Sequence, residues 1–182
     1  MRGHTAESTI GSETGFDTFA VANAFLELGH HGSNNWPPIT PMKIQKLVYF
    51  AYGWYLAITK GRRLTDSVIE AWDYGPVIRT LYKHFKQFGA EPIQGRAMRH
   101  GRVPVLPNGP HGLLAHEIIT FVWDLYGRYT GIELSNMTHV SDAPWTKTRQ
   151  LFPSGAVPAG KDIDDATIRE YFERLLADAR TF

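Results

Sequence analysis

The segment between Thr40 and Gly61 constrains the fold most, because it predicts one long helix with clear ends. Thr40 is a good N-cap, and Pro41 suits the first helical position, where its missing N–H is no loss. Gly61 can end the helix just after Lys60. Apolar side chains recur at helical spacing along one face, formed by Ile44, Leu47, Val48, Ala51, Tyr55 and Ile58. We expect this face to be buried.

The next segment changes the periodicity from helical to alternating, which predicts a short strand at 67–73. A turn follows at 74–76, where Pro76 suits the first position of a further helix that ends at Gly89. The irregular, basic stretch that follows contains a second short strand at 102–106. We expect the two strands to pair in a small sheet.

Helical periodicity continues through most of the remaining chain. It predicts helices at residues 17–29, 110–130, 132–139, 143–152 and from 164 onward, with a loop at 153–161. The predicted fold class is therefore α+β and predominantly α-helical: a compact helical domain with one small β-sheet. A length of 182 residues with 43% hydrophobic side chains fits a single domain, which we place at 16–182. Residues 1–15 are small and polar and predict a flexible N-terminal tail.

Composition narrows the cellular setting of the protein. The chain has no cysteine, which excludes disulfide and thiolate chemistry and fits a reducing compartment. It has no apolar run long enough to cross a bilayer, and its N-terminus lacks the apolar centre of a secretory signal. We expect a soluble cytoplasmic protein without a membrane partner.

The charge of the chain is unevenly distributed. Residues 40–103 carry eleven Lys and Arg against four acids, a net +7, whereas 1–39 and 104–182 each carry −3. A basic middle segment can attract nucleic acid or an acidic protein. It can equally consist of ordinary solvated helix faces. A DNA-binding regulator that uses residues 40–103 is the alternative function.

The eight histidines do not form a recognisable metal site. His30 and His31 are adjacent and diverge by about 100° on a helix. His111 and His116 are five residues apart, whereas two ligands on one helical face are four apart. No glycine-rich loop for a phosphate or a dinucleotide is present either. We predict no metal and no cofactor.

One cluster has the residue types of a hydrolase. Ser135 and His139 are four residues apart on a predicted helix, and Asp142 could orient the imidazole. No strained nucleophile elbow or oxyanion hole accompanies them. We interpret these side chains as a brace for the loop before Pro144, and we predict that the protein is not an enzyme.

Candidate partner-binding residues are the cations and aromatics that lie off the predicted core. Lys43 and Lys46 fall away from the centre of the apolar stripe of helix 41–60, so we expect them on its exposed part, and Trp54 lies beside that stripe. Buried aromatic anchors dominate protein interfaces. The partner-binding set is Trp36, Lys43, Lys46, Trp54, Arg96, Arg99 and Arg102.

Four blocks of this sequence resemble the Panacea antitoxin domain, a family also called SocA-like or GepA-like. They are the Pro-x-Lys-x-Gln-Lys-Leu-x-Tyr pattern of 41–49, residues 70–77, the group Leu134-Ser135, Thr138-His139 and Pro144-Trp145, and the closing Ile163, Ile168 and Tyr171-Phe172. The resemblance spans roughly 16–176. Its motif residues are read as determinants of the fold: Pro41, Gln45, Tyr49, Trp72, Tyr74, Gly75, Pro76, Thr138, His139, Pro144 and Trp145.

The resemblance implies the antitoxin half of a bacterial toxin–antitoxin pair, which neutralises a protein toxin by direct contact. We expect partner specificity in the less regular surfaces at 30–39 and 90–112 and on exposed helix faces. The tail at 1–15 suggests a second role, as a handle through which an energy-dependent AAA+ protease receives the toxin. The alternative hypothesis is that the tail has no function.

Overall fold

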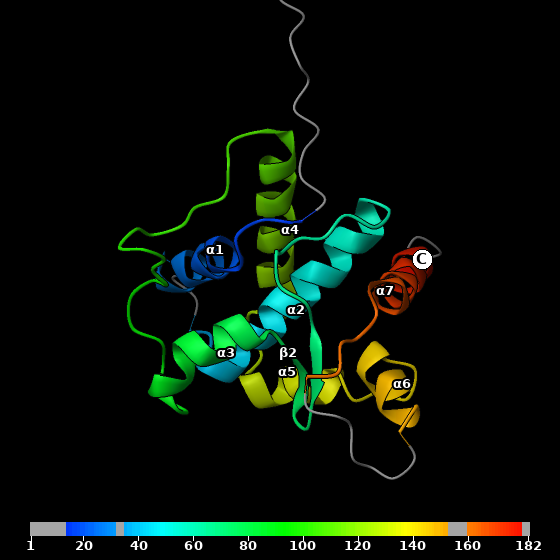
Figure 1. Ribbon diagram of the computed structural model, residues 1–182. Coiled ribbons are helices and arrows are strands. Elements are labelled where there is room, and N and C mark those ends of the chain that lie inside the picture. Colours follow the sequence, from blue (N-terminus) through cyan, green and yellow to red (C-terminus); the bar gives the residue numbers. More distant parts are fainter. Residues whose placement is uncertain (1–13, 32–34, 153–159, 180–182) are drawn as a thin grey trace, which may run out of the picture.

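Helix α2 (Pro41–Ile58) runs through the middle of the protein, and the other elements pack around it (Figure 1). The computed structural model describes residues 14–31, 35–152 and 160–179. Thr40 caps α2, because its hydroxyl accepts a hydrogen bond from the Lys43 amide at 3.3 Å. Every residue from Lys43 to Ala57 is buried. The helix is therefore covered on all sides, and its apolar surface extends beyond the single stripe that the periodicity predicts.

The described ranges contain six further α-helices. They are α1 (Thr18–His31), α3 (Arg79–Phe85), α4 (Pro110–Tyr126), α5 (Gly131–Met137), α6 (Pro144–Gln150) and α7 (Asp165–Ala179). All but α6 pack directly on α2, and α6 packs on α7 and on the first strand. The contact between α2 and α7 is close at Gly53, where a Cβ atom would lie 2.1 Å from the Phe172 ring. The prediction of a predominantly helical α+β fold is confirmed.

The described residues form one sheet, an antiparallel hairpin of β1 (Glu70–Trp72) and β2 (Gly75–Val77). Glu70 pairs with Val77, and Trp72 pairs with Gly75. The other edge of β1 meets the chain before α7, where the Ala71 amide donates to the Lys161 carbonyl at 2.8 Å. The first predicted strand is thus present in shortened form.

Two predictions about this region are wrong. Residues 102–106 do not pair with 67–73, because β2 is the strand that pairs with β1. In the 102–106 stretch, Arg102 forms an isolated bridge with Arg99. Pro76 does not begin a helix either. It lies in β2, and α3 begins three residues later, at Arg79, followed by a short 3-10 helix (Lys86–Phe88). Proline is tolerated in an edge strand because it needs no partner for an N–H.

The start of the described chain is fixed to the body of the protein. The Phe16 amide donates to the Leu64 carbonyl at 2.9 Å, and the Phe16 carbonyl accepts from the Asp66 amide at 2.8 Å. Most of the predicted tail (1–13), part of the predicted loop at 30–39 (32–34) and most of the loop at 153–161 lie outside the described residues. Within the described ranges, no helix combines the length and the apolar character needed to cross a bilayer.

Candidate functional site

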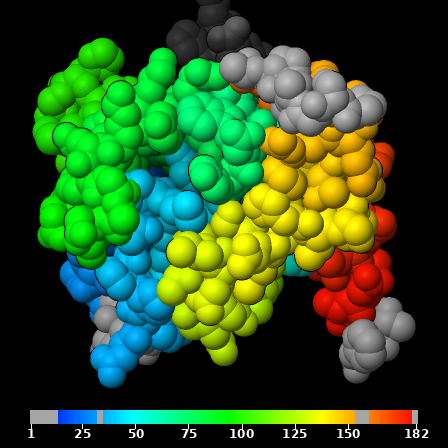
Figure 2. All heavy atoms as spheres, turned by 90° about the horizontal axis from the view of Figure 1, so that it is seen from below, coloured from blue at the N-terminus to red at the C-terminus, as the bar shows by residue number. Residues whose placement is uncertain are grey.

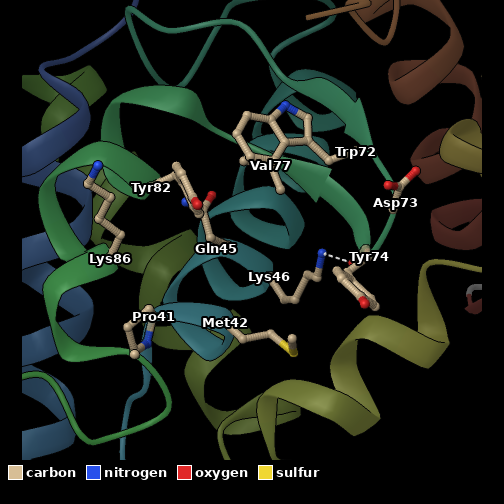
Figure 3. Close-up of a pocket in the computed structure, with 11 residues that line it drawn as sticks. Pro41, Met42, Gln45, Lys46, Trp72, Asp73, Tyr74, Val77, Tyr82 and Lys86 are labelled. Atoms are coloured by element: carbon tan, nitrogen blue, oxygen red, sulfur yellow. Dashed lines mark hydrogen bonds between the residues drawn. The ribbon is translucent and has the colours of Figure 1, made fainter. Parts of the chain in front are cut away.

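A groove of about 480 Å³ lies at the N-terminal end of α2. Its walls come from the start of α2, the β1–β2 hairpin and α3 with the turn after it. Figure 2 shows these segments together on one face, beside α5. Figure 3 shows most of its lining residues, which are Pro41, Met42, Gln45, Lys46, Trp72, Asp73, Tyr74, Val77, Tyr82, Lys86 and Gly89. The groove thus brings together two sequence blocks that are separated in the chain.

Lys46 binds the backbone of the hairpin from the buried side. Its side chain is 1% exposed, and its Nζ donates hydrogen bonds to the carbonyls of Tyr74 at 2.7 Å and Pro76 at 3.0 Å. The Ser135 hydroxyl also donates to the Tyr74 carbonyl, at 2.8 Å. Burial lowers the pKa of Lys46 to about 7. An amine that would normally reach into water is used here to fix the backbone of a turn.

Gln45 performs a similar task at the end of β2. Its Oε1 accepts from the Ile78 amide at 2.8 Å, and its Nε2 donates to the Ile78 carbonyl at 3.1 Å. Pro76 has no N–H, and its carbonyl is bound to Lys46. The outer edge of β2 is therefore occupied by side chains from α2 and does not offer a ladder of free backbone groups.

Gly75 allows the hairpin to approach these anchors. Its φ is +100°, and a Cβ atom there would lie 2.7 Å from both Lys46 Nζ and Thr138 Oγ1. A side chain at this position would meet both strain and a clash. The glycine is thus required by the close packing of α2, the hairpin and the segment after α5.

The third sequence block packs against the other side of the hairpin. The Trp145 indole donates to the Trp72 carbonyl at 2.7 Å, and the His139 and Trp145 rings lie 3.9 Å apart. The Thr138 hydroxyl donates to the Ser135 carbonyl at 2.7 Å, and His139 Nδ1 donates to the same oxygen at 2.6 Å. Thr138 and His139 thus bond the backbone at the end of α5, and Trp145 joins the start of α6, where Pro144 is the first helical residue, to the hairpin.

The Ser135, His139 and Asp142 side chains are not arranged as a catalytic triad. The Ser135 hydroxyl donates to the hairpin, His139 bonds a backbone carbonyl, and Asp142 pairs with Arg174 at 3.2 Å. Within the described ranges, no group of three or more His, Cys, Asp or Glu side chains is placed to hold a metal ion. The contacts of this cluster are those of a structural brace.

A charged pair orders the aromatic wall of the groove. Arg79 binds the Glu70 carboxylate through two hydrogen bonds, at 2.8 and 2.6 Å, and the Trp72 indole donates to the same carboxylate at 2.8 Å. Burial opposes ionisation of Glu70, but the hydrogen bonds from Arg79 and Trp72 lower its pKa below the usual value. The Arg79 guanidinium lies over the Trp72 ring at 5.4 Å, and the Tyr82 ring lies 4.8 Å from the Trp72 ring. Trp72 is therefore held in one orientation.

Comparison with known families agrees with the geometry of these blocks. A model of the family described as "Antitoxin SocA-like, Panacea domain" matches residues 44–146. A similar protein is "Antitoxin SocA" of Caulobacter vibrioides (strain NA1000 / CB15N), 32% identical over 159 residues, which cover 86% of this chain and 82% of the relative. The chain belongs to the SocA-like Panacea family. No solved structure matches it significantly.

The matched region of this Panacea domain extends from α2 through the hairpin to the start of α6. It contains the anchors Gln45, Lys46 and Ser135 as well as Thr138 and Trp145. The resemblance stated from the sequence blocks is thus confirmed, and membership of an antitoxin family supports an antitoxin role.

Four of the residues predicted to bind a partner are placed differently from expectation in this Panacea domain. Lys43 and Lys46 are buried, so the prediction that they lie on an exposed helix face is wrong. Lys43 Nζ donates to the carbonyls of Pro37 and Gly127, the latter at 2.7 Å, and burial lowers its pKa to about 8 against the opposing effect of Glu133. Trp54 is 6% exposed and packs in the core, and Trp36 is half-buried against Trp123.

The other three predicted residues lie on the irregular segment after α3. Arg96 pairs with Glu27 at 3.4 Å, Arg99 pairs with Asp17 at 3.1 Å, and Arg102 is exposed. None of the three lines the groove. Arg99 and Arg102 are joined by a backbone bridge, so the structure brings two of them together.

Sequence reasoning missed the outward-facing residues of the groove. Met42, Tyr82 and Lys86 line it, and none was selected from the sequence. A signal was available, because Arg79, Tyr82, Lys83 and Lys86 share a helical face opposite the predicted apolar positions Leu81 and Phe85. Exposed tyrosine and arginine side chains are enriched at protein interfaces, so Tyr82 beside Arg79 was the part of this pattern that could have been selected.

Proposed function

We propose that this SocA-like protein is a cytoplasmic antitoxin that neutralises a protein toxin by binding it at the groove between α2, the hairpin and α3. The observation that carries the proposal is the use of buried polar side chains to fix an outward-facing aromatic. Lys46 and Ser135 bind the Tyr74 backbone, while the Tyr74 side chain is 75% exposed at the rim (Figure 3). A fixed backbone loses little conformational entropy when the aromatic side chain that it carries binds a partner, and tyrosine is a frequent interface hot spot.

The test is complex formation with the product of the neighbouring gene. The two proteins are co-expressed and co-purified, and growth measures neutralisation. We expect Tyr74→Ala to weaken binding by about 2 kcal/mol, roughly thirtyfold, and to leave the melting temperature unchanged. The backbone contacts of Tyr74 do not involve the deleted ring.

Val105→Ala is the matched control, because Val105 is 74% exposed and lies in the segment 90–112, where sequence reasoning placed specificity. Failure of the wild-type protein to form a complex or to relieve toxicity would refute the proposed function. Loss of binding in Val105→Ala with full binding by Tyr74→Ala would move the contact to the 90–112 segment.

Delivery of the toxin to an AAA+ protease is the second step that we propose. Phe16 is fixed beside Leu64 and Asp66, beyond the C-terminal end of α2, whereas the groove lies at its N-terminal end. Eighteen helical residues separate the two ends by about 27 Å. A protease bound to the segment before Phe16 would therefore leave the groove accessible to the toxin. Deletion of residues 2–13 should lengthen the toxin half-life in cells, and an unchanged half-life would remove this role.

The alternative of a DNA-binding regulator has less support. Of the eleven cations in residues 40–103, Lys43 and Lys46 are buried. Five more form ion pairs with acidic side chains, namely Lys60, Arg63, Arg79, Arg96 and Arg99. Most of the local positive charge is therefore neutralised or withdrawn from the surface. DNA binding that weakens steeply with salt would revive the alternative.

A further inference from the structure

Helix α3 borders the groove with a row of cations. Arg79 and Lys83 lie four residues apart on α3, and Lys86 follows three residues later at the start of the 3-10 helix, so the three cations follow the same side of this segment as Tyr82. Arg79 is engaged by Glu70. Lys83 and Lys86 are exposed and form no ion pair with any residue in the described ranges. Lys86 lines the groove and Lys83 lies one helical turn before it, where it also contributes to the field at Glu70, so this border carries a net positive charge.

The interior of the groove offers apolar surface but few free hydrogen-bonding side chains. The amide of Gln45 is bound to Ile78, and the amine of Lys46 is bound to two carbonyls. Asp73, at the rim, pairs with Arg149 at 3.1 Å. A group that enters between Met42 and Tyr82 displaces water from apolar side chains and finds few free hydrogen-bonding partners there. The groove therefore favours an apolar group.

The hairpin also limits how a partner can bind. Pro76 lacks an N–H, and Lys46 and Gln45 occupy the backbone groups of the outer edge from Tyr74 to Ile78. A partner strand therefore cannot extend the sheet at β2, and recognition must depend on side chains.

We propose that the groove recognises an acidic segment of the partner that inserts a bulky apolar side chain against Met42 and Tyr82 and places carboxylates beside Lys83 and Lys86. This inference rests on the proposed function of the groove as the toxin site. The apolar interior provides the anchor, and the cationic border provides orientation and a faster association rate.

A polypeptide fits this site better than a nucleic acid does. Single-stranded nucleic acid binds by stacking bases on open aromatic faces. In the groove, the Arg79 guanidinium and the Tyr82 ring both lie against the Trp72 ring, at 5.4 and 4.8 Å. The Trp72 ring is therefore already packed against these two side chains, and its indole N–H is bound to Glu70.

The experiment compares two double charge reversals with the same net change. Lys83→Glu with Lys86→Glu alters the border of the groove. Arg62→Glu with Lys147→Glu alters two exposed cations elsewhere, just beyond the C-terminal end of α2 and on α6, which lies across the hairpin from α3 (Figure 1). Titration calorimetry measures the binding of each purified protein to the purified neighbouring gene product at low and high salt, and thermal melting confirms that each protein is folded.

We expect the Lys83/Lys86 variant to bind at least about tenfold more weakly than wild type at low salt and to lose most of the salt dependence. The control variant should behave as wild type does. Equal binding by both variants, or selective loss in the control, would overturn the acidic-segment proposal while the proposed function stands. Absence of a complex with wild type would overturn both. Displacement of the partner by a single-stranded oligonucleotide would show that nucleic acid occupies the groove instead.

Discussion

Replacement of Lys46 by methionine should change how the stability of the protein depends on pH. Methionine has a similar length but carries no charge, so it removes the cost of burying an ammonium group. Burial lowers the pKa of Lys46 from 10.5 to about 7 in the folded protein, whereas the unfolded chain keeps the ordinary value. Between these two values the unfolded state binds more protons than the native state. The free energy of unfolding contributed by Lys46 therefore rises with pH in this window.

The size of the effect follows from the pKa difference. Each pH unit within the window changes the free energy of unfolding by up to about 1.4 kcal/mol. Between pH 7.5 and 9.5 the wild-type protein should gain about 2.5 kcal/mol relative to Lys46→Met. Below about pH 7 the amine is protonated in both states, so the difference between the two proteins should become constant.

The assay is urea denaturation of both proteins from pH 6 to 10, with the difference in unfolding free energy plotted against pH. The subtraction removes groups that titrate in both proteins, including Lys43, whose pKa is also lowered. A difference that stays flat across the range would show that the carbonyls of Tyr74 and Pro76 compensate the burial of the charge. That result would refute the assignment of Lys46 as a strongly desolvated amine.

Two further substitutions test the anchoring of the hairpin. Gln45→Leu should lower the free energy of unfolding by about 2 kcal/mol, because the Ile78 amide loses its partner and the Ile78 carbonyl keeps only the bond from the Tyr82 amide; an unchanged urea midpoint would contradict this. Gly75→Ala should cost more than Gly95→Ala, measured by thermal melting. Both glycines have positive φ, but a Cβ atom at Gly75 meets two neighbours at 2.7 Å, whereas Gly95 has none within 4 Å. Equal losses would argue against the clash.

The ends of the main elements could be predicted because they depend on local chemistry. Thr40 and Pro41 begin α2 as expected, and Gly89 ends the 3-10 turn after α3 with a φ of +56°. The burial of Lys43 and Lys46 could not be predicted in the same way. Their carbonyl partners lie at residues 37, 127, 74 and 76, and only tertiary packing brings them to the helix.

One sequence signal pointed to that packing. Residues 47–58 contain no charged side chain, which is the pattern of a helix buried on every side, whereas the periodicity of the apolar residues indicates only one buried face. The strand pairing was missed for a related reason. Pro76 fits the start of a helix by local rules, but the carbonyl contacts of Lys46 and the amide contacts of Gln45 stabilise an edge strand there instead. Local preference was overridden by long-range hydrogen bonds.

The inward anchoring of the hairpin separates two sets of residues that natural selection can act on independently. Lys46, Gln45 and Ser135 maintain the shape of the turn from inside the protein, and substitutions there damage folding. Met42, Tyr74 and Tyr82 line the groove without making these anchoring contacts through their side chains. Under the proposed function, substitutions at those outer positions would change which toxin is bound at little cost in stability. Members of the family could then differ in partner while they keep the same hairpin anchors.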